Sequence, residues 1–294
     1  MTKKKDSKGR LPAAFFISGS GPQDRNGFSS GIDLGTHEIL DRLTSLGFLV
    51  LRVDDRGTGE SSAMRPDESY LDLVADARAC VEHLMERDDV DPQRIVLLGH
   101  SEGAETAPIL AVERPEIAAI VLMAPPGRPI QEIIADQNRL ELEKQALGKD
   151  EIEKQMKEVR AFLAKLASDE PMDATNASAE ERTALASRKW FQSHSKHDPL
   201  DTIEKVKCPV LILQGAKDFQ VSPEKDAAAL DAGLRAAHHP DHELRVLAGL
   251  DHLFKKTPGE KSELADYWKS RPVDPEFLDA LGAWLKKRFE PLGD

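Results

Sequence analysis

The stretch RIVLLGHSEGAETAPILAVERP, residues 94–115, passes from a short apolar run into a segment with helical spacing. Between the two lies Gly99-His100-Ser101-Glu102-Gly103, in which a glycine stands two positions from the serine on either side. A sharp turn from a strand into a helix forces its middle residue to positive φ and requires small neighbours. The pattern therefore predicts that Ser101 lies at the carboxyl end of a strand and at the N-terminus of a helix.

Five further apolar runs bounded by Gly, Pro or Asp resemble residues 94–99. They lie at residues 13–18, 47–54, 117–124, 209–215 and 242–249. Segments with apolar residues at i, i+3 and i+4 alternate with them, at residues 35–46, 69–87, 102–114, 223–237 and 275–289. Near-continuous Val, Ile and Leu content indicates strands buried on both faces. We therefore expect an α/β fold, a mainly parallel sheet of about six strands covered by helices.

Residues 129–196 interrupt this alternation. They contain no strand-like run and are rich in Glu, Lys, Ala and Leu with helical spacing, and their length is far beyond that of an ordinary connection. We interpret them as an inserted helical cap, between core segments 11–128 and 197–294. A charged, solvated hairpin without a role is the alternative. The aromatic pair Trp190 and Phe191 favours packing onto the core. Residues 1–10 are expected to be a frayed basic tail.

Charge and composition exclude several classes of protein. The 294 residues include 40 Lys+Arg and 52 Asp+Glu, a formal net charge of −12, which disfavours a nucleic-acid partner. No run approaches the roughly 20 apolar residues of a membrane span. Cys80 and Cys208 are too few for a disulfide framework and are expected to be buried thiols in the cytoplasm. The N-terminus has the pattern of a secretory signal, but cleavage near Ser18 or Ser20 would remove a loop needed below, so we expect no export.

A serine hydroxyl needs a base and an acid to act as a nucleophile. Since the carboxyl ends of parallel strands share one edge, both partners should directly follow strands. Asp218 follows the run at residues 209–215, and His252 follows the run at residues 242–249. With Ser101 they give the chain order Ser, Asp, His. We predict that these three residues form a catalytic triad.

The other candidates for base, acid or metal ligand fit less well. A cluster of three histidines precedes the last strand at its opposite end, and two more stand as H-x-x-H near the end of the inserted segment without an accompanying H-E-x-x-H pattern. We therefore expect no metal site. Two aspartates that follow no strand are the alternative acids. These residues are His238, His239, His242, His194, His197, Asp198 and Asp201.

Acyl transfer also needs donors for an oxyanion. One is expected to be the N–H of Glu102, the residue after the serine, and the other to come from the loop Ser18-Gly19-Ser20-Gly21. Ser20 is the first choice and Gly21 the second. A Glu102 carboxylate facing the cavity would repel anionic substrates, whereas one pointing away could pair with a base.

These motifs, with DDRGTGESS at residues 54–62, resemble the α/β-hydrolase superfamily. SGSGPQDRNG at residues 18–27, residues 190–221 and LAGLDHLF at residues 247–254 resemble bacterial carboxylesterase-type hydrolases, near the dienelactone-hydrolase and acyl-thioester-hydrolase groups. The similarity covers residues 13–289. It implies a serine hydrolase that needs no cofactor or metal, with a helical cap over its pocket. It also implies that Asp55 and Arg56 form a buried structural pair and that Asp24 and Arg25 anchor the oxyanion loop.

The sequence departs from that family in two places. Members usually begin with an antiparallel strand pair, for which only a dozen residues precede Ala13, so this edge is expected to be missing or completed by another chain. Ser18 stands where many relatives have His, which changes the polarity of the loop but not its N–H donors.

We predict hydrolysis of carboxylic esters with short to medium acyl chains through an acyl-enzyme. Gly21, His100, Trp190 and Phe191 are expected to contact the substrate. An acyl thioesterase and a catalytically inactive binding protein are the alternatives, and an interaction protein acting through its helical cap is a third. The sequence leaves a homo-oligomer open.

Overall fold

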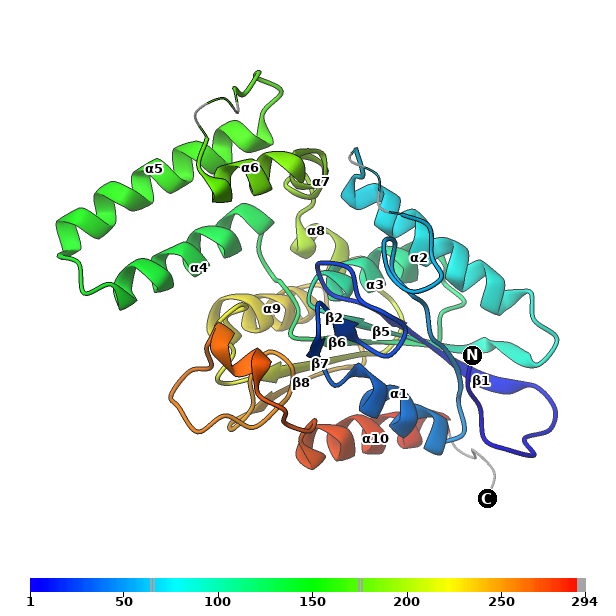
Figure 1. The fold of residues 1–294 in the computed structure, drawn as a ribbon. Helices are drawn as coiled ribbons and strands as arrows, with labels where there is room; N and C mark the ends of the chain where they lie inside the picture. The colour runs from blue at the N-terminus through cyan, green and yellow to red at the C-terminus, as the bar shows by residue number, and fades with distance from the viewer. Residues whose placement is uncertain (64, 66, 174, 176, 290–294) are drawn as a thin grey trace.

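The computed structural model describes residues 1–63, 65, 67–173, 175 and 177–289. Its centre is a six-stranded sheet in the order β4-β1-β5-β6-β7-β8, in which every neighbouring pair is parallel (Figure 1). The strands of this sheet are β1 (Leu11–Ile17), β4 (Leu49–Leu51), β5 (Val90–His100), β6 (Ala119–Met123), β7 (Val210–Gly215) and β8 (His242–Leu247). A separate hairpin pairs β2 (Phe28–Ser29) with β3 (Ile32–Asp33).

All six expected strands and the expected α/β fold are confirmed. The central strands β6 and β7 are buried along their whole length, as their apolar runs predicted. Burial on both faces requires every backbone N–H and C=O of these strands to be paired within the sheet. Because all neighbouring strands of the sheet are parallel, the carboxyl ends of β1, β5, β7 and β8 lie at one edge, and the predicted site residues follow them.

Helices cover both faces of the sheet (Figure 1). On one face, α1 (Thr36–Ser45) and α10 (Pro275–Phe289) form an apolar cluster with the sheet. A second cluster fills the opposite face. The elements on that side are α2 (Tyr70–Met85), α3 (Glu102–Glu113), α8 (Pro199–Ile203), η1 (Pro223–Ala227) and α9 (Ala228–Ala236). The short helix η2 (Leu264–Trp268) precedes α10.

Among the described residues, four helices stand between β6 and α8 and form a lobe beside the sheet (Figure 1). They are α4 (Ile130–Lys144), α5 (Lys149–Ala167), α6 (Ala179–Ala186) and α7 (Arg188–His194). The lobe has its own small apolar core, which includes Met156, Leu163 and Phe191. Trp190 packs against both this core and the core between the sheet and α2 and α3. The inserted helices are thus attached to the sheet domain through α7.

The N-terminal segment is attached to the edge of the sheet. Thr2 forms an antiparallel bridge with Val50 of β4, with N···O distances of 2.9 and 2.8 Å in the two directions. Lys3 forms an ion pair with Asp89 at 3.1 Å. The expectation of a frayed tail is therefore wrong at these residues. We expected the antiparallel edge to be missing or completed by another chain, and within the described residues this isolated bridge is what pairs with β4 in the antiparallel sense.

Candidate active site

Ser101 lies in the turn that joins β5 to α3, with φ 52° and ψ −119°. A Cβ on Gly99 would lie 2.1 Å from the carbonyl oxygen of Gly103, and a Cβ on Gly103 would lie 2.2 Å from the carbonyl oxygen of Ile17. Neither position has room for a side chain. The turn therefore holds the serine hydroxyl at the N-terminus of α3, where the helix dipole favours developing negative charge.

The loop after β1 packs directly against this turn. A Cβ on Gly19 would lie 3.1 Å from the Cβ of Ser101 and 3.2 Å from Nδ1 of His100. Ser20 follows in the same loop. Glu102 is the first residue of α3, so its N–H has no acceptor within the helix. The two residues expected to donate to an oxyanion therefore lie on segments adjacent to the serine.

Asp218 and His252 come together from the loops after β7 and β8. Nδ1 of His252 lies 2.7 Å from Oδ2 of Asp218, and both residues are buried. The ring of His252 packs beside that of His100, with centroids 4.8 Å apart, and Nε2 of His100 lies 2.9 Å from the His252 carbonyl oxygen. Since His100 immediately precedes Ser101, this contact places the imidazole of His252 next to the turn that carries the serine.

His100 packs beside His252 and contacts its carbonyl oxygen. Burial, and then the neighbouring His252, lower the pKa of His100 to about 3, so its ring stays neutral. A substrate contact was expected for His100. The structure instead packs its ring against the side of His252.

The Asp218 carboxylate is held by hydrogen bonds that the sequence analysis did not anticipate. Gln214 of β7, wholly buried, donates from Nε2 to Oδ2 at 3.0 Å. The N–H groups of Gln220 and Val221 donate to Oδ1 at 2.8 and 3.1 Å. A glutamine inside the apolar run at residues 209–215 is the signal that could have revealed this role, because a buried amide requires a partner.

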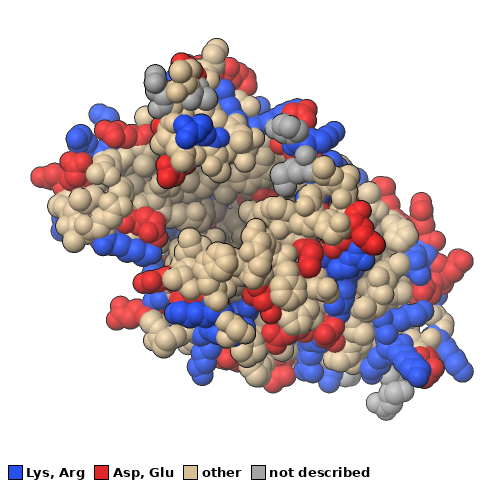
Figure 2. Space-filling model, viewed as in Figure 1, with Lys and Arg blue, Asp and Glu red and all other residues tan. Residues whose placement is uncertain are grey.

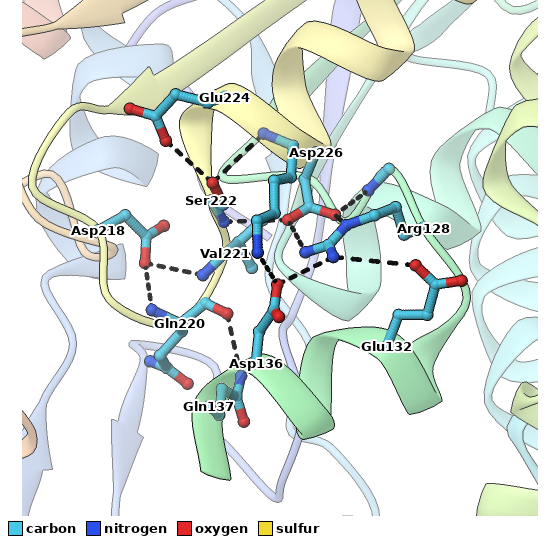
Figure 3. Close-up of polar contacts among 12 residues, drawn as sticks. Arg128, Glu132, Asp136, Gln137, Asp218, Gln220, Val221, Ser222, Glu224 and Asp226 are labelled. Atoms are coloured by element: carbon cyan, nitrogen blue, oxygen red, sulfur yellow. Dashed lines mark hydrogen bonds and ion pairs between the residues drawn. The ribbon is translucent and has the colours of Figure 1, made fainter. Parts of the chain in front are cut away.

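Figure 3 shows how this loop is attached to α4. Nε2 of Gln137 donates to the carbonyl oxygen of Gln220 at 3.0 Å. Beside it, the wholly buried Asp226 accepts two hydrogen bonds from the guanidinium of Arg128, each 2.9 Å long. The first inserted helix is thus fixed to the loop that carries Asp218.

Asp55 holds the loop after β1. The Ser18 hydroxyl lies 2.7 and 2.8 Å from its two carboxyl oxygens, and the N–H of Gln23 donates at 3.0 Å. Burial raises the pKa of Asp55 to about 6 against the effect of these donors. The expected pair with Arg56 is wrong, because Arg56 binds Asp76 of α2 instead.

Asp24 and Arg25 hold the continuation of the same loop. Oδ1 of Asp24 accepts from the N–H groups of Asn26 and Phe28, each at 2.9 Å. Nε of Arg25 donates to Asp54 at 3.0 Å. These contacts fix the chain just beyond Ser20.

The Glu102 side chain is buried and paired. Its Oε2 accepts from the indole N–H of Trp190 at 2.8 Å and from the Ser20 hydroxyl at 3.4 Å. Nδ1 of His194 lies 3.8 Å away. Burial raises the pKa of Glu102 to about 7, although the nearby His194 opposes this rise. The sequence analysis considered a pairing with a base, but it did not identify His194 or Trp190 as the partners.

A cavity of about 710 Å³ borders the predicted oxyanion loop. Ser20, Gly21, Glu102 and Trp190 are among the residues that line it. Phe191, for which a substrate contact was expected, is 2% exposed and packs in the core of the inserted helices. Figure 2 shows the surface hollowed between these helices and the sheet domain, with acidic and basic side chains interspersed around it.

Some of the other candidate residues have partners away from the turn at Ser101. Asp198 caps α8 by accepting from the N–H of Leu200 at 3.0 Å. Nε2 of His194 lies 2.9 Å from Glu105. His242 is the first residue of β8 and therefore lies at the amino ends of the strands, away from the edge that carries Ser101. Over the described residues, no group of three or more His, Cys, Asp or Glu side chains could hold a metal ion. None of the described helices is both long enough and apolar enough to cross a membrane.

Comparison with known proteins identifies the family. Residues 34–256, more than half of the chain, match the Hydrolase_4 family, described as "Serine aminopeptidase, S33". The chain belongs to this hydrolase family. The matched residues include the turn at Ser101 and the residues of the predicted triad, Asp218 and His252.

Among curated relatives, "Esterase EstD" of Thermotoga maritima is 31% identical over 280 residues, which cover 95% of this chain and 63% of EstD. The chain therefore spans a little under two thirds of the length of that relative. "Putative hydrolase YtaP" of Bacillus subtilis is 30% identical over 116 residues, 34% of this chain and 39% of YtaP.

A solved structure, the Pyrococcus furiosus esterase Pf2001, has a TM-score of 0.61 at 19% identity, covering 96% of this chain and 84% of its own. At this identity the likeness concerns the fold, and it confirms the expected α/β-hydrolase fold.

Gly99→Ala is expected to lower the free energy of unfolding by at least about 2 kcal/mol, because the new methyl group must displace the backbone of Gly103. Urea denaturation measures the change. Gly249→Ala is the matched control, since its added Cβ would meet the end of the Lys256 side chain only at 4.0 Å. Equal stability of the two variants would contradict the tight packing of the turn.

The contribution of Asp55 to the free energy of unfolding should fall as the pH rises. Its pKa increases from 3.8 in the unfolded chain to about 6 in the folded protein, so the folded state keeps a proton that the unfolded chain loses. This contribution is complete below about pH 4 and is lost as the pH rises through about pH 6. Relative to Asp55→Asn, the wild type should lose roughly 2–3 kcal/mol between about pH 3.5 and pH 7.

Urea denaturation of both proteins across this range measures that loss. Asp72 provides a control of opposite sign, because hydrogen bonds from Ser69 lower its pKa to about 2. Relative to Asp72→Asn, the wild type should gain stability as the pH rises from about 2 to about 4, so the control series extends to about pH 2. A difference between wild type and Asp55→Asn that does not change with pH would refute the assignment for Asp55.

Proposed function

We propose that this protein hydrolyses carboxylic esters, with Ser101 as nucleophile, His252 as base and Asp218 as the acid that orients the base. The 2.7 Å contact between His252 and Asp218, next to the turn at Ser101, is the observation that carries the proposal. The 31% identity to a protein named Esterase EstD supports an ester as substrate.

In the first step, the neutral imidazole of His252 takes the proton of the Ser101 hydroxyl while the serine oxygen attacks the ester carbonyl. Asp218 accepts the Nδ1–H of His252, which keeps Nε2 free for this proton and stabilises the imidazolium that forms. The protonated His252 then donates to the leaving alcohol. A water molecule, deprotonated by His252, releases the acid from Ser101 in the same way.

The tetrahedral intermediate carries a negative oxygen that needs fixed donors. We assign this role to the backbone N–H groups of Glu102 and Ser20. The N–H of Glu102, the first residue of α3, has no acceptor within the helix, and Ser20 follows Gly19 in the loop that packs against Ser101. The mechanism uses only groups of this chain and requires no cofactor or metal.

The substrate is proposed to be a small, uncharged ester with a short to medium acyl chain. The cavity beside Ser20, Gly21 and Trp190 has a volume suited to a small-molecule ligand. The net charge of −12 disfavours anionic thioesters such as acyl-CoA. In this proposal residues 129–196 act as a cap on a core formed by residues 11–128 and 197–294.

The free thiols of Cys80 and Cys208 support a reducing compartment, and we propose the cytoplasm. Burial raises the pKa of Cys80 to about 11 and that of Cys208 to about 12, so neither is a competing nucleophile at neutral pH.

Ser101→Ala should reduce kcat for p-nitrophenyl esters by at least about 10⁴-fold, because the nucleophile is lost. Asp218→Asn should reduce kcat by a similar factor, since the amide favours the wrong tautomer of His252. A chain-length series from acetate to decanoate, measured beside one acyl thioester, should show the fastest turnover with the shorter esters.

Ser45→Ala, at the exposed end of α1, is the control and should retain full activity. Full activity of Ser101→Ala would contradict the proposal. Faster turnover of the thioester would identify a thioesterase. No turnover of any ester, with no reaction of Ser101 toward a fluorophosphonate, would favour an inactive binding protein.

A further inference from the structure

The carboxyl group of Glu102 joins three separate parts of the chain. It extends from the first residue of α3, immediately after Ser101. The same oxygen accepts hydrogen bonds from Trp190 of α7 and from the hydroxyl of Ser20 in the loop after β1. One buried carboxyl oxygen thus connects the turn of the nucleophile, the oxyanion loop and the inserted helices.

The surroundings of this carboxyl leave it few alternative positions. The residue is 7% exposed. Its neighbour His194 binds Glu105 through Nε2, and the His194 ring stacks on Tyr70 of α2 with centroids 4.1 Å apart. The Trp190 ring meets the His194 ring edge-on at 5.0 Å. A buried carboxyl group without hydrogen bonds costs free energy, and the packed neighbours limit the positions that it can take. The Glu102 carboxyl therefore stays hydrogen-bonded to Trp190 and Ser20.

The two residues joined by the Ser20–Glu102 hydrogen bond are the same two whose N–H groups we assign to the oxyanion. Such a pair of donors works only when both stay about 2.7–3.1 Å from the position of the developing charge. A side-chain link between the two residues fixes their separation and leaves both N–H groups free. The hydrogen bond from the indole N–H of Trp190 to Glu102 makes the distance between the two oxyanion donors depend on the position of α7.

We propose that Glu102 is a positioning residue, whose carboxyl sets the spacing of the two oxyanion donors and couples it to the docking of α7 through Trp190. This inference rests on the proposed ester hydrolysis. It goes further in giving the inserted helices a part in stabilising the transition state, beyond covering a pocket.

Glu102→Ala should lower kcat about 10- to 100-fold, because misplaced donors stabilise the oxyanion less. KM should change by less than about threefold, since the bound ester does not yet carry that charge. Trp190→Phe keeps an aromatic ring in place but removes the N–H, and it should lower kcat about tenfold. Glu102→Gln retains an accepting oxygen and should restore kcat to within about fivefold of wild type.

The two changes break one link, so their effects should not multiply. The double variant Glu102→Ala, Trp190→Phe should be no more than about twofold slower than Glu102→Ala alone. Glu113→Ala, at the other end of α3, and Trp268→Phe, at a position that is 67% exposed, are matched controls that should leave kcat and KM unchanged.

Two further measurements separate positioning from a general loss of structure. Rates are expressed per reactive Ser101, counted with a fluorophosphonate, so that misfolded protein does not contribute. The affinity for a trifluoromethyl ketone, which mimics the tetrahedral state, should fall by the same factor as kcat/KM. A wild-type kcat in Glu102→Ala, a change confined to KM, or multiplied effects in the double variant would each overturn the inference.

The conservative Trp190→Phe change provides the same test if Glu102→Ala does not fold. Failure of the proposed function would appear as ester turnover that survives Ser101→Ala. Failure of this inference would appear as Ser101 labelling and ester turnover at wild-type rates in Trp190→Phe.

Discussion

The close backbone approach at the turn between β5 and α3 is the constraint on which the site depends. Since Gly99 and Gly103 carry no side chains, α3 can begin directly against the loop after β1, and Ser101 is held at positive φ. The same turn fixes His100, against which His252 packs. The loop after β1 and the imidazole of His252 thus both pack against the one stretch of backbone that carries Ser101.

The inserted helices contact this arrangement on two sides. At one end, Arg128, which precedes α4, binds the buried Asp226 of η1, and Gln137 of α4 donates to Gln220 in the loop after Asp218 (Figure 3). At the other end, Trp190 of α7 reaches Glu102. Because both contacts involve buried carboxyl groups, movement of these helices would expose or unpair a charge. The inserted helices are thus attached both beside the loop of Asp218 and at Glu102, the residue after the proposed catalytic serine.

Local sequence patterns predicted the features that are determined by residues close together in the chain. The six strands follow from apolar runs, and the turn at Ser101 follows from its glycines and from the strand and helix around it. The partners of Asp55 and Glu102 could not be predicted, because they come from segments distant in sequence and carry no motif. Thr2 was missed for a similar reason, since a single bridge to β4 leaves no periodic pattern. Gln214 was also missed, although a polar residue within a buried strand is a local signal that could have revealed its role.

The identity of the reactive residue is the central claim, and peptide mapping after reaction with a fluorophosphonate tests it most directly. We expect a single adduct per folded chain, located on Ser101, which forms more slowly in the His252→Ala variant and is absent after denaturation. An adduct on another residue, or none in the folded protein, would contradict the account.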